Sequence, residues 1–232
     1  MLRILVVIAV LLWLPIIGVV ALRLAGPYFQ QRAIEKRIRA WPKKRAATTF
    51  TSRLHEGDLI FHTSQSAQSQ AIQLATHSRY SHCGLLYKTH GEWQVFEAVQ
   101  PVQLTPLARW VARGQGRHFV VKRLRDAQTA LTPAALARLR AAGQPLLGLD
   151  YDLVFNWSDK QLYCSELIWK VYDRGLHRQL GQLQRLRDFD LTSPAVQAKL
   201  RQRYGTHLPL DEPVISPASL FASTELRTVI SR

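Results

Sequence analysis

Residues 80–99 read YSHCGLLYKTHGEWQVFEAV and contain two apolar strand patterns, 81–88 and 93–99, on either side of the turn 89–92. Two such patterns around a short turn that contains glycine are typical of a β-hairpin. Residues whose numbers sum to about 180 face each other in this hairpin, so His82 is expected close to Glu97 on the neighbouring strand. Because a carboxylate within an apolar strand is costly unless it has a partner, we expect the two side chains to interact.

Outward from the hairpin, short apolar runs predict further strands and amphipathic runs predict helices. The expected strands are 58–62 and 118–124, and the expected helices are 66–76, 105–112 and one that contains Cys164 in its first turn. Three more helices are expected where a hydroxyl N-cap precedes a proline, at Thr132-Pro133, Ser193-Pro194 and Ser216-Pro217. Gly175 and Gly205 stand where helix C-caps belong. Hairpin-joined strands with helices before and after them predict an α+β fold with a small antiparallel sheet.

Cys164 is the candidate nucleophile. It stands in QLYCSEL, residues 161–167, at the start of a predicted helix, where free N–H groups and the macrodipole favour an anion. A thiol in such a position can have its pKa lowered to roughly 3.5–7.5. A single cysteine there is more often a small buried hydrophobe. Together with His82 and Glu97, however, it completes the set that a cysteine nucleophile needs, namely a thiol, an imidazole base and an orienting polar group.

Three other side chains are candidates for the same site. His77 is the second candidate for the base, although its polar surroundings favour a solvated loop histidine. Tyr151 and Tyr163 are candidates for oxyanion or substrate contacts, and packing is the more common role for each. Tyr163 directly precedes the nucleophile, so its side chain is expected to diverge from the thiol. The backbone N–H of Cys164 is the expected oxyanion donor, because a helix start presents free donors.

Several other classes of protein lack their motifs here. The sequence has no G-x-S-x-G, G-x-x-x-x-G-K-[ST], H-E-x-x-H or G-x-G-x-x-G segment, which argues against serine hydrolases, P-loop NTPases, zincins and dinucleotide-binding proteins. Its two cysteines, Cys83 and Cys164, form neither a disulfide framework nor a C-x-x-C zinc motif, and no metal or other cofactor is expected. The formal net charge of +15 indicates an anionic neighbour. Since the basic residues are scattered, nucleic-acid binding is not favoured.

Four segments resemble the YiiX-like proteins, which are bacterial, circularly permuted members of the NlpC-type papain-like cysteine peptidases. They are GDLIF at 57–61, ATHSRYSH at 75–82, VFEAV at 95–99 and YCSEL at 163–167. The resemblance extends over nearly all of 54–230, and the histidine precedes the cysteine, as in the permuted group. It implies a circularly permuted papain-like α+β fold. It also implies that Cys164 is the nucleophile, His82 the base and Glu97 the third, orienting residue.

The resemblance further implies a cysteine hydrolase that cleaves an amide bond through an acyl-enzyme, with cell-wall peptides as the expected substrate. Two alternatives stay open. One is a lipid amide or ester hydrolase, or an acyltransferase of the lecithin:retinol acyltransferase type. The other is a non-catalytic binding module on the same fold. Cys83 and Cys164 are expected to stay free, because strand alternation sends Cys83 to the face opposite His82.

The N-terminal segment has the features of a membrane anchor. Residues 4–22 carry no ionisable side chain and span roughly 28 Å as a helix, close to the thickness of the bilayer core. A cleaved signal peptide is the competing interpretation, but no good small-x-small cleavage site follows. We expect an anchor or signal segment at 1–22, a basic juxtamembrane linker or helix at 23–53 against anionic headgroups, and a hydrolase domain at 54–232.

The expected location is the bacterial inner membrane, with one span and the catalytic domain in the periplasm. Residues 23–45 carry eight Lys and Arg against one Glu, a flank that the positive-inside rule would keep in the cytoplasm. Large domains, however, translocate largely regardless of such charges. Cell-wall hydrolases of the family that the sequence resembles act outside the cytoplasm, and we therefore expect the catalytic domain in the periplasm.

Overall fold

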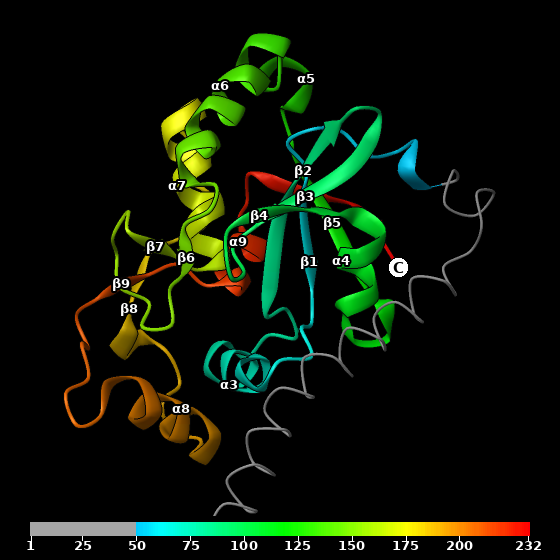
Figure 1. Ribbon diagram of the computed structural model, residues 1–232. Coiled ribbons are helices and arrows are strands. Elements are labelled where there is room, and N and C mark those ends of the chain that lie inside the picture. The colour runs from blue at the N-terminus through cyan, green and yellow to red at the C-terminus, as the bar shows by residue number, and fades with distance from the viewer. Residues whose placement is uncertain (1–49) are drawn as a thin grey trace, which may run out of the picture. The chain divides into compact units, whose positions relative to one another are not determined.

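The structure is a computed structural model that describes residues 50–232. Helices pack around one main β-sheet (Figure 1). The anchor expected at 4–22 and the basic flank at 23–45 lie outside the described residues. No helix within 50–232 is both long and apolar enough to cross a membrane.

The main sheet has six strands in the order β10-β5-β1-β2-β3-β4, and every neighbouring pair is antiparallel. The strands are β1 Leu59–His62, β2 His82–Thr89, β3 Glu92–Glu97, β4 Gln103–Pro106, β5 Val120–Leu124 and β10 Leu226–Ser231. The antiparallel sheet and the strands expected near 60, 85, 95 and 121 are confirmed. The two edge strands, β4 and β10, were not predicted, and the helix expected at 105–112 begins at Leu107, because Thr105 and Pro106 belong to β4.

The hairpin of β2 and β3 sets the position of the catalytic candidates. Leu85 lies opposite Phe96, and the strands are joined through His90 and Gly91, which both have positive φ, 51° and 83°. Positive φ at both central residues is the requirement of a type I′ turn, whose twist matches that of the strands. The turn therefore fixes the register that brings the far end of the hairpin, His82 and Glu97, together.

The main helices are α3 Ala67–Thr76, α4 Leu107–Arg113, α6 Pro133–Gly143, α7 Cys164–Leu176, α8 Pro194–Tyr204 and α9 Pro217–Ala222. The three N-caps expected before proline are confirmed, since Thr132, Ser193 and Ser216 each accept a backbone N–H three residues later. The C-cap expected at Gly205 is also confirmed, with a φ of 63°.

The C-cap expected at Gly175 is wrong. Helix α7 continues to Leu176, and His177 is the residue that adopts the left-handed conformation, with a φ of 53°. Gly175 instead allows α7 to approach α6, because a Cβ at this position would lie 3.0 Å from Cα of Leu139. The glycine therefore serves close helix packing rather than helix termination.

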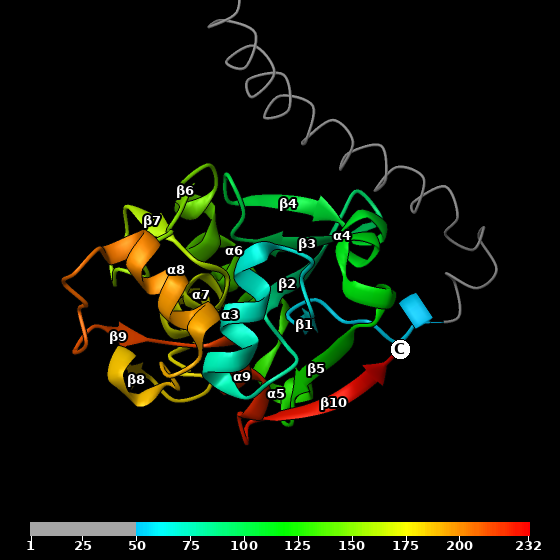
Figure 2. The ribbon, with the colours of Figure 1, turned by 90° about the horizontal axis from the view of Figure 1, so that it is seen from below.

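Helix α7 packs against β2 and β3 on one face of the sheet, and α6 packs outside α7 (Figure 1). Helix α4 covers the other face near β3 and β4 and buries Trp110. Helices α3 and α8 lie side by side near one end of the sheet (Figure 2). The parallel pair β6 Asp150–Tyr151 and β7 Gln161–Leu162 leads directly into Cys164. The start of α7 thus meets the end of the β2–β3 hairpin.

Candidate active site

Three side chains from three different elements meet at this junction. His82 is the first residue of β2, Glu97 is the last residue of β3, and Cys164 is the first residue of α7. The contact expected between His82 and Glu97 is present, with Nε2 of His82 2.7 Å from Oε2 of Glu97. Since Nε2 is occupied by Glu97, Nδ1 is the nitrogen left for the hydrogen bond between His82 and the thiol of Cys164.

Glu97 is fully buried, and both of its oxygens are bonded. Oε1 accepts hydrogen bonds from Oγ1 of Thr105, at 2.6 Å, and from a guanidinium nitrogen of Arg113, while Oε2 faces His82. Burial favours the neutral acid, but the hydrogen bond to His82 and the charge of Arg113 prevail and lower the pKa of Glu97 to about 2. The site therefore holds a permanent negative charge behind the imidazole.

The histidine and the cysteine form an ion pair. Burial lowers the pKa of His82, but the negative charges of Cys164 and Glu97 and the hydrogen bonds to both outweigh it and raise the pKa to about 9. A hydrogen bond from Cys83, and then the charge of His82, hold the pKa of Cys164 well below its usual value against the effect of burial. At neutral pH the pair is thus thiolate and imidazolium, the reactive form of a cysteine nucleophile.

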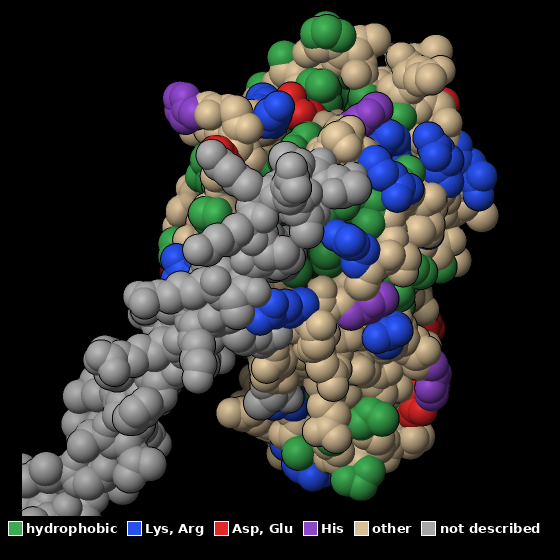
Figure 3. Space-filling model, turned by 90° about the vertical axis from the view of Figure 1, so that its right-hand side faces the viewer, with side chains coloured by type: hydrophobic (Ala, Val, Ile, Leu, Met, Phe, Trp, Pro, Cys, Tyr) green, Lys and Arg blue, Asp and Glu red, His purple; other side chains and the backbone are tan. Residues whose placement is uncertain are grey.

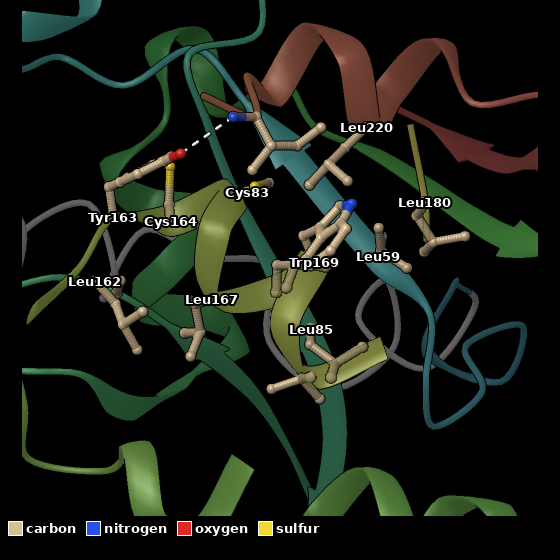
Figure 4. Packing of buried hydrophobic residues seen from close by; sticks show 14 of the residues in the cluster. Leu59, Cys83, Leu85, Leu162, Tyr163, Cys164, Leu167, Trp169, Leu180 and Leu220 are labelled. Carbon is tan, nitrogen blue, oxygen red and sulfur yellow. Dashed lines mark hydrogen bonds between the residues drawn. The ribbon is translucent and has the colours of Figure 1, made fainter. Parts of the chain in front are cut away.

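Cys83 lies beside the nucleophile, contrary to the geometric reason given for its staying free. The two cysteines are free and buried, as expected, but they belong to one packed cluster (Figure 4). Alternation along β2 holds, since His82 is on the side of Trp110 in α4 and Cys83 is on the side of α7. Cys164, the first residue of α7, lies on this same face of the sheet, so Cys83 is next to it. His82 reaches the thiol from the N-terminal end of β2.

The role of Cys83 follows from its protonation state. Burial, and then the hydrogen bond to Cys164, raise the pKa of the Cys83 thiol well above its usual value. The Cys83 thiol therefore stays protonated and its S–H donates a hydrogen bond to the thiolate, and the backbone N–H of Cys83 donates to the same sulfur. Sequence reasoning missed this role because it placed α7 against the wrong face of the strand.

The two tyrosine candidates differ in how they are engaged. The hydroxyl of Tyr163 accepts the backbone N–H of Ile215 at 3.1 Å, as Figure 4 shows. Its side chain lines the same cavity as Cys164, so the expected divergence from the thiol is wrong. The hydroxyl of Tyr151 accepts a hydrogen bond from Nε2 of Gln68 at 3.1 Å and also lines that cavity. Tyr151 is thus the tyrosine better placed for a substrate contact.

His77, the second candidate for the base, is remote from the thiol. It is the C-cap of α3, its side chain is 76% exposed, and its nearest acidic partner is Asp190 at 3.3 Å. Residues that the sequence did not point to complete the site instead. Arg113 and Thr105 hold Glu97, and their positions depend on the packing of α4 and β4 rather than on any local motif.

Two cavities meet at the site, and we call the one lined almost entirely by apolar surface the apolar cavity and the other, whose lining mixes polar and apolar side chains, the polar cavity. The apolar cavity includes Cys164 and Tyr163 and is otherwise lined mainly by Phe155, Leu186, Phe189, Val196 and Leu200. The polar cavity is lined by the polar residues His62, Ser64, Ser66, Ser81, His82, Gln100 and Arg113 and by the apolar residues Ala98, Val99 and Leu153. Gln68, Ile72 and Tyr151 belong to both linings and therefore stand between the two cavities.

A helix-start cysteine packed on an antiparallel sheet, with its histidine and carboxylate on that sheet, defines the papain-like class of cysteine hydrolase. The order of histidine before cysteine defines its permuted branch. The chain belongs to the C92 family of permuted papain-like amidase enzymes, YaeF/YiiX, whose model matches residues 53–230.

Two relatives agree with this assignment. The chain is 47% identical over 173 residues to the uncharacterized protein YiiX of Escherichia coli (strain K12), which covers 75% of this chain and 84% of that protein. It is also similar to the crystal structure of metalloprotein yiiX from Escherichia coli O157:H7, DUF1105. The TM-score is 0.74 at 45% identity, and the match covers 78% of this chain and 98% of the other. The expected permuted papain-like fold is thereby confirmed.

Proposed function

We propose that this chain is a cysteine amidase in which Cys164 is the nucleophile, His82 the acid and base, and Glu97 the residue that orients His82. One observation carries the proposal: the 2.7 Å hydrogen bond between His82 and a buried, ionised Glu97. His82 stands at the end of β2 that also meets the thiol of Cys164. A non-catalytic binding module has no need of a buried carboxylate that keeps an imidazole protonated, since burying such charges is costly.

The reaction runs in two steps. The thiolate of Cys164 attacks the carbonyl carbon, the C–N bond breaks, and the proton of His82 passes to the leaving nitrogen. The product is a thioester and a free amine. Water then attacks the thioester, gives one proton back to His82, and releases a carboxylic acid and the thiolate. The backbone N–H of Cys164, at the start of α7, is the proposed donor to the carbonyl oxygen.

The lining of the apolar cavity bears on the substrate. Cell-wall peptides and lipid amides or esters are the two substrate classes that the sequence leaves in competition. The surface of the cavity beside Cys164 is mostly aliphatic and aromatic, although polar residues also contribute to the lining, namely Gln68, Thr76, Tyr151, Tyr163, Ser165, Lys199, Arg203 and Ser216. An apolar acyl group would bury its surface there, whereas a peptide would leave its amide groups without partners. This lining favours a lipid amide over a cell-wall peptide as the substrate.

The description of one relative as a metalloprotein raises the question of a metal in this chain. Within residues 50–232, no group of three or more His, Cys, Asp and Glu side chains is arranged to hold a metal ion. Both oxygens of Glu97 are engaged by Arg113, Thr105 and His82. These residues do not fit a metal centre, and the proposed reaction has no step through one.

A comparison of two substrate panels tests the proposal. Purified protein is incubated with fatty acyl amides and with cell-wall peptides, and released amines are measured. We expect turnover of at least one panel by the wild type and none by Cys164→Ala, with unchanged circular dichroism. His207→Ala, at an exposed histidine outside the site, serves as the control and should stay active. Equal turnover by wild type and Cys164→Ala would end the proposal, and turnover of peptides alone would return the substrate to the cell wall.

We also propose that residues 4–22 anchor the domain to the inner membrane on the periplasmic side, with anionic lipid headgroups as partners of the basic flank. The support comes from the sequence of these residues and from the charge of the domain. Residues 50–232 carry 22 Lys and Arg against 15 Asp and Glu. Figure 3 shows Lys and Arg side chains spread over one face and few acidic ones. An excess of positive charge favours an anionic surface.

A further inference from the structure

The nucleophile and the base open into different cavities. Cys164 belongs to the lining of the apolar cavity and His82 to that of the polar cavity, and neither belongs to both. The amide bond under attack must lie between the two groups. The acyl part therefore remains on the side of Cys164, and the leaving nitrogen, which takes the proton of His82, remains on the side of the polar cavity.

The charge that faces the polar cavity is positive. Its lining contains two histidines and Arg113, but no Asp or Glu among the described residues. Glu97 compensates this charge from a fully buried position, with its oxygens already bonded to Thr105, Arg113 and His82. Only one nitrogen of the Arg113 guanidinium is used in that bond, and Nε of Arg113 has no hydrogen-bond partner.

His62 is the second unexplained group in this cavity. It is 2% exposed, its ring is stacked on Trp110 at 3.8 Å, and neither ring nitrogen is bonded to a described residue. A Cβ on Gly114 would lie 2.8 Å from Nδ1 of His62, so Nδ1 faces that backbone and Nε2 is the nitrogen turned away from it. Nδ1 is thus the buried nitrogen without a partner, and Nε2, which no described residue bonds, is the nitrogen open to a ligand.

The charge state of His62 is set by its neighbours. Burial, and then the positive charges of His82 and Arg113, hold the pKa of His62 well below 6.5. The ring is therefore neutral at neutral pH and can donate one hydrogen bond without competing for the proton of His82. A neutral donor beside a guanidinium suits a carboxylate, which accepts from both.

We propose that the polar cavity is the leaving-group subsite and takes an amine that carries a carboxylate, with His62 and Arg113 as its contacts. The substrate is then an amide between an apolar acyl group and an amino acid. This inference rests on the proposed function, because it uses the direction of proton transfer. It assigns His62 to substrate specificity and leaves Arg113 with a second role besides holding Glu97.

Paired substrates test the subsite. N-dodecanoylglycine and N-dodecanoylglycinamide share the acyl chain and differ only in the carboxylate. We expect kcat/KM of the wild type to favour the carboxylate by about tenfold or more, as a hydrogen bond to a charged group predicts. His62→Phe keeps the stacking on Trp110 but removes both nitrogens, and should lose most of this preference. His62→Gln keeps an N–H donor and should retain part of it, while His207→Phe, at an exposed histidine, is the matched control.

A second measurement needs no turnover. The rates at which iodoacetate and iodoacetamide alkylate Cys164 are compared in the wild type and in His62→Phe. We expect the ratio of the two rates to fall in the variant, since iodoacetate carries the carboxylate. If neither amide is hydrolysed but the ratio depends on His62, the subsite stands and the proposed function fails. A preference or a ratio that is the same in wild type and His62→Phe overturns the subsite, even where both amides are hydrolysed.

Discussion

His82 and Glu97 bond at 2.7 Å although they are diagonal rather than opposite neighbours in the β2–β3 ladder. The register pairs Leu85 with Phe96, so continuing it places Gly84 opposite Glu97, with His82 two residues further along on the same face of β2. A Cβ at position 84 would lie 2.2 Å from Cγ1 of Val95, which is a clash, and 3.6 Å from Cβ of Glu97, which is an ordinary contact. Gly84 therefore leaves the space that Val95 occupies next to Glu97 on β3.

Gly84→Ala is expected to destabilise the fold by about 1–3 kcal/mol through overpacking, and to lower activity. The free energy of unfolding from denaturant titration measures the first effect. In a double-mutant cycle the cost of Gly84→Ala should shrink on a Val95→Ala background, which removes the 2.2 Å contact. An equal cost on both backgrounds would show that Val95 is not the obstacle.

The ion pair predicts the pH dependence of the reaction. The reactive form needs Cys164 deprotonated and His82 protonated, so kcat/KM should fall at high pH with an apparent pKa of about 9, that of His82. Glu97→Gln removes the negative charge that supports the imidazolium, so the pKa of His82 falls and the basic limb moves to lower pH. The pH profile of kcat/KM tests this. A basic limb at the same pH in wild type and Glu97→Gln would contradict the role given to Glu97.

Cys83 is expected to control the reactivity of the nucleophile. Cys83→Ala removes the S–H donor, which is the largest influence that lowers the pKa of Cys164, so alkylation by iodoacetamide should slow at low pH and recover at high pH. Cys83→Ser keeps a donor and should retain the wild-type profile. Because the Cys83 thiol has a raised pKa and is buried, only Cys164 should be labelled in the wild type. If the pH dependence of alkylation were the same in Cys83→Ala and in the wild type, Cys83 would have no role in the mechanism.

Arg113 is expected to govern stability at acid pH. The pKa of Glu97 is lowered in the fold from 4.5 to about 2, so its stabilisation is present above its unfolded pKa and is lost as pH falls towards 2. Arg113→Ala removes a charged hydrogen bond and should cost about 1.5–3 kcal/mol at neutral pH. It also raises the pKa of Glu97, so stability should start to fall at a higher pH. Urea titrations between pH 2 and 7 test this, with Arg109→Ala on the same helix as control. A difference between variant and wild type that does not change with pH would contradict it.

The membrane topology is tested with C-terminal fusions. We expect an alkaline phosphatase fusion to be active and a green fluorescent protein fusion to be dark, because the domain is proposed to reach the periplasm. A fusion that lacks residues 1–22 should reverse both results. A bright fluorescent fusion with inactive phosphatase in the full chain would place the domain in the cytoplasm and turn the search for substrates to cytoplasmic-leaflet lipids.

The sequence by itself determined the elements near the site and one of its contacts. Strand alternation and a tight turn are local properties, so the His82–Glu97 contact followed from the spacing of the hairpin. The helix start at Cys164 followed from apolar periodicity, and the N-caps at Thr132, Ser193 and Ser216 from a two-residue signal. Each of these depends on residues close in the chain, which the sequence displays directly.

Only the tertiary structure decided what surrounds these residues. The face of β2 against which α7 packs determines whether Cys83 or its neighbour meets the thiol, and no local pattern distinguishes the two faces of a strand that is buried on both sides. The same holds for Arg113 behind Glu97 and for His62 in the polar cavity, which come from α4 and β1. Their positions result from the packing of elements distant in sequence, and packing is set by the shape and volume of the whole core.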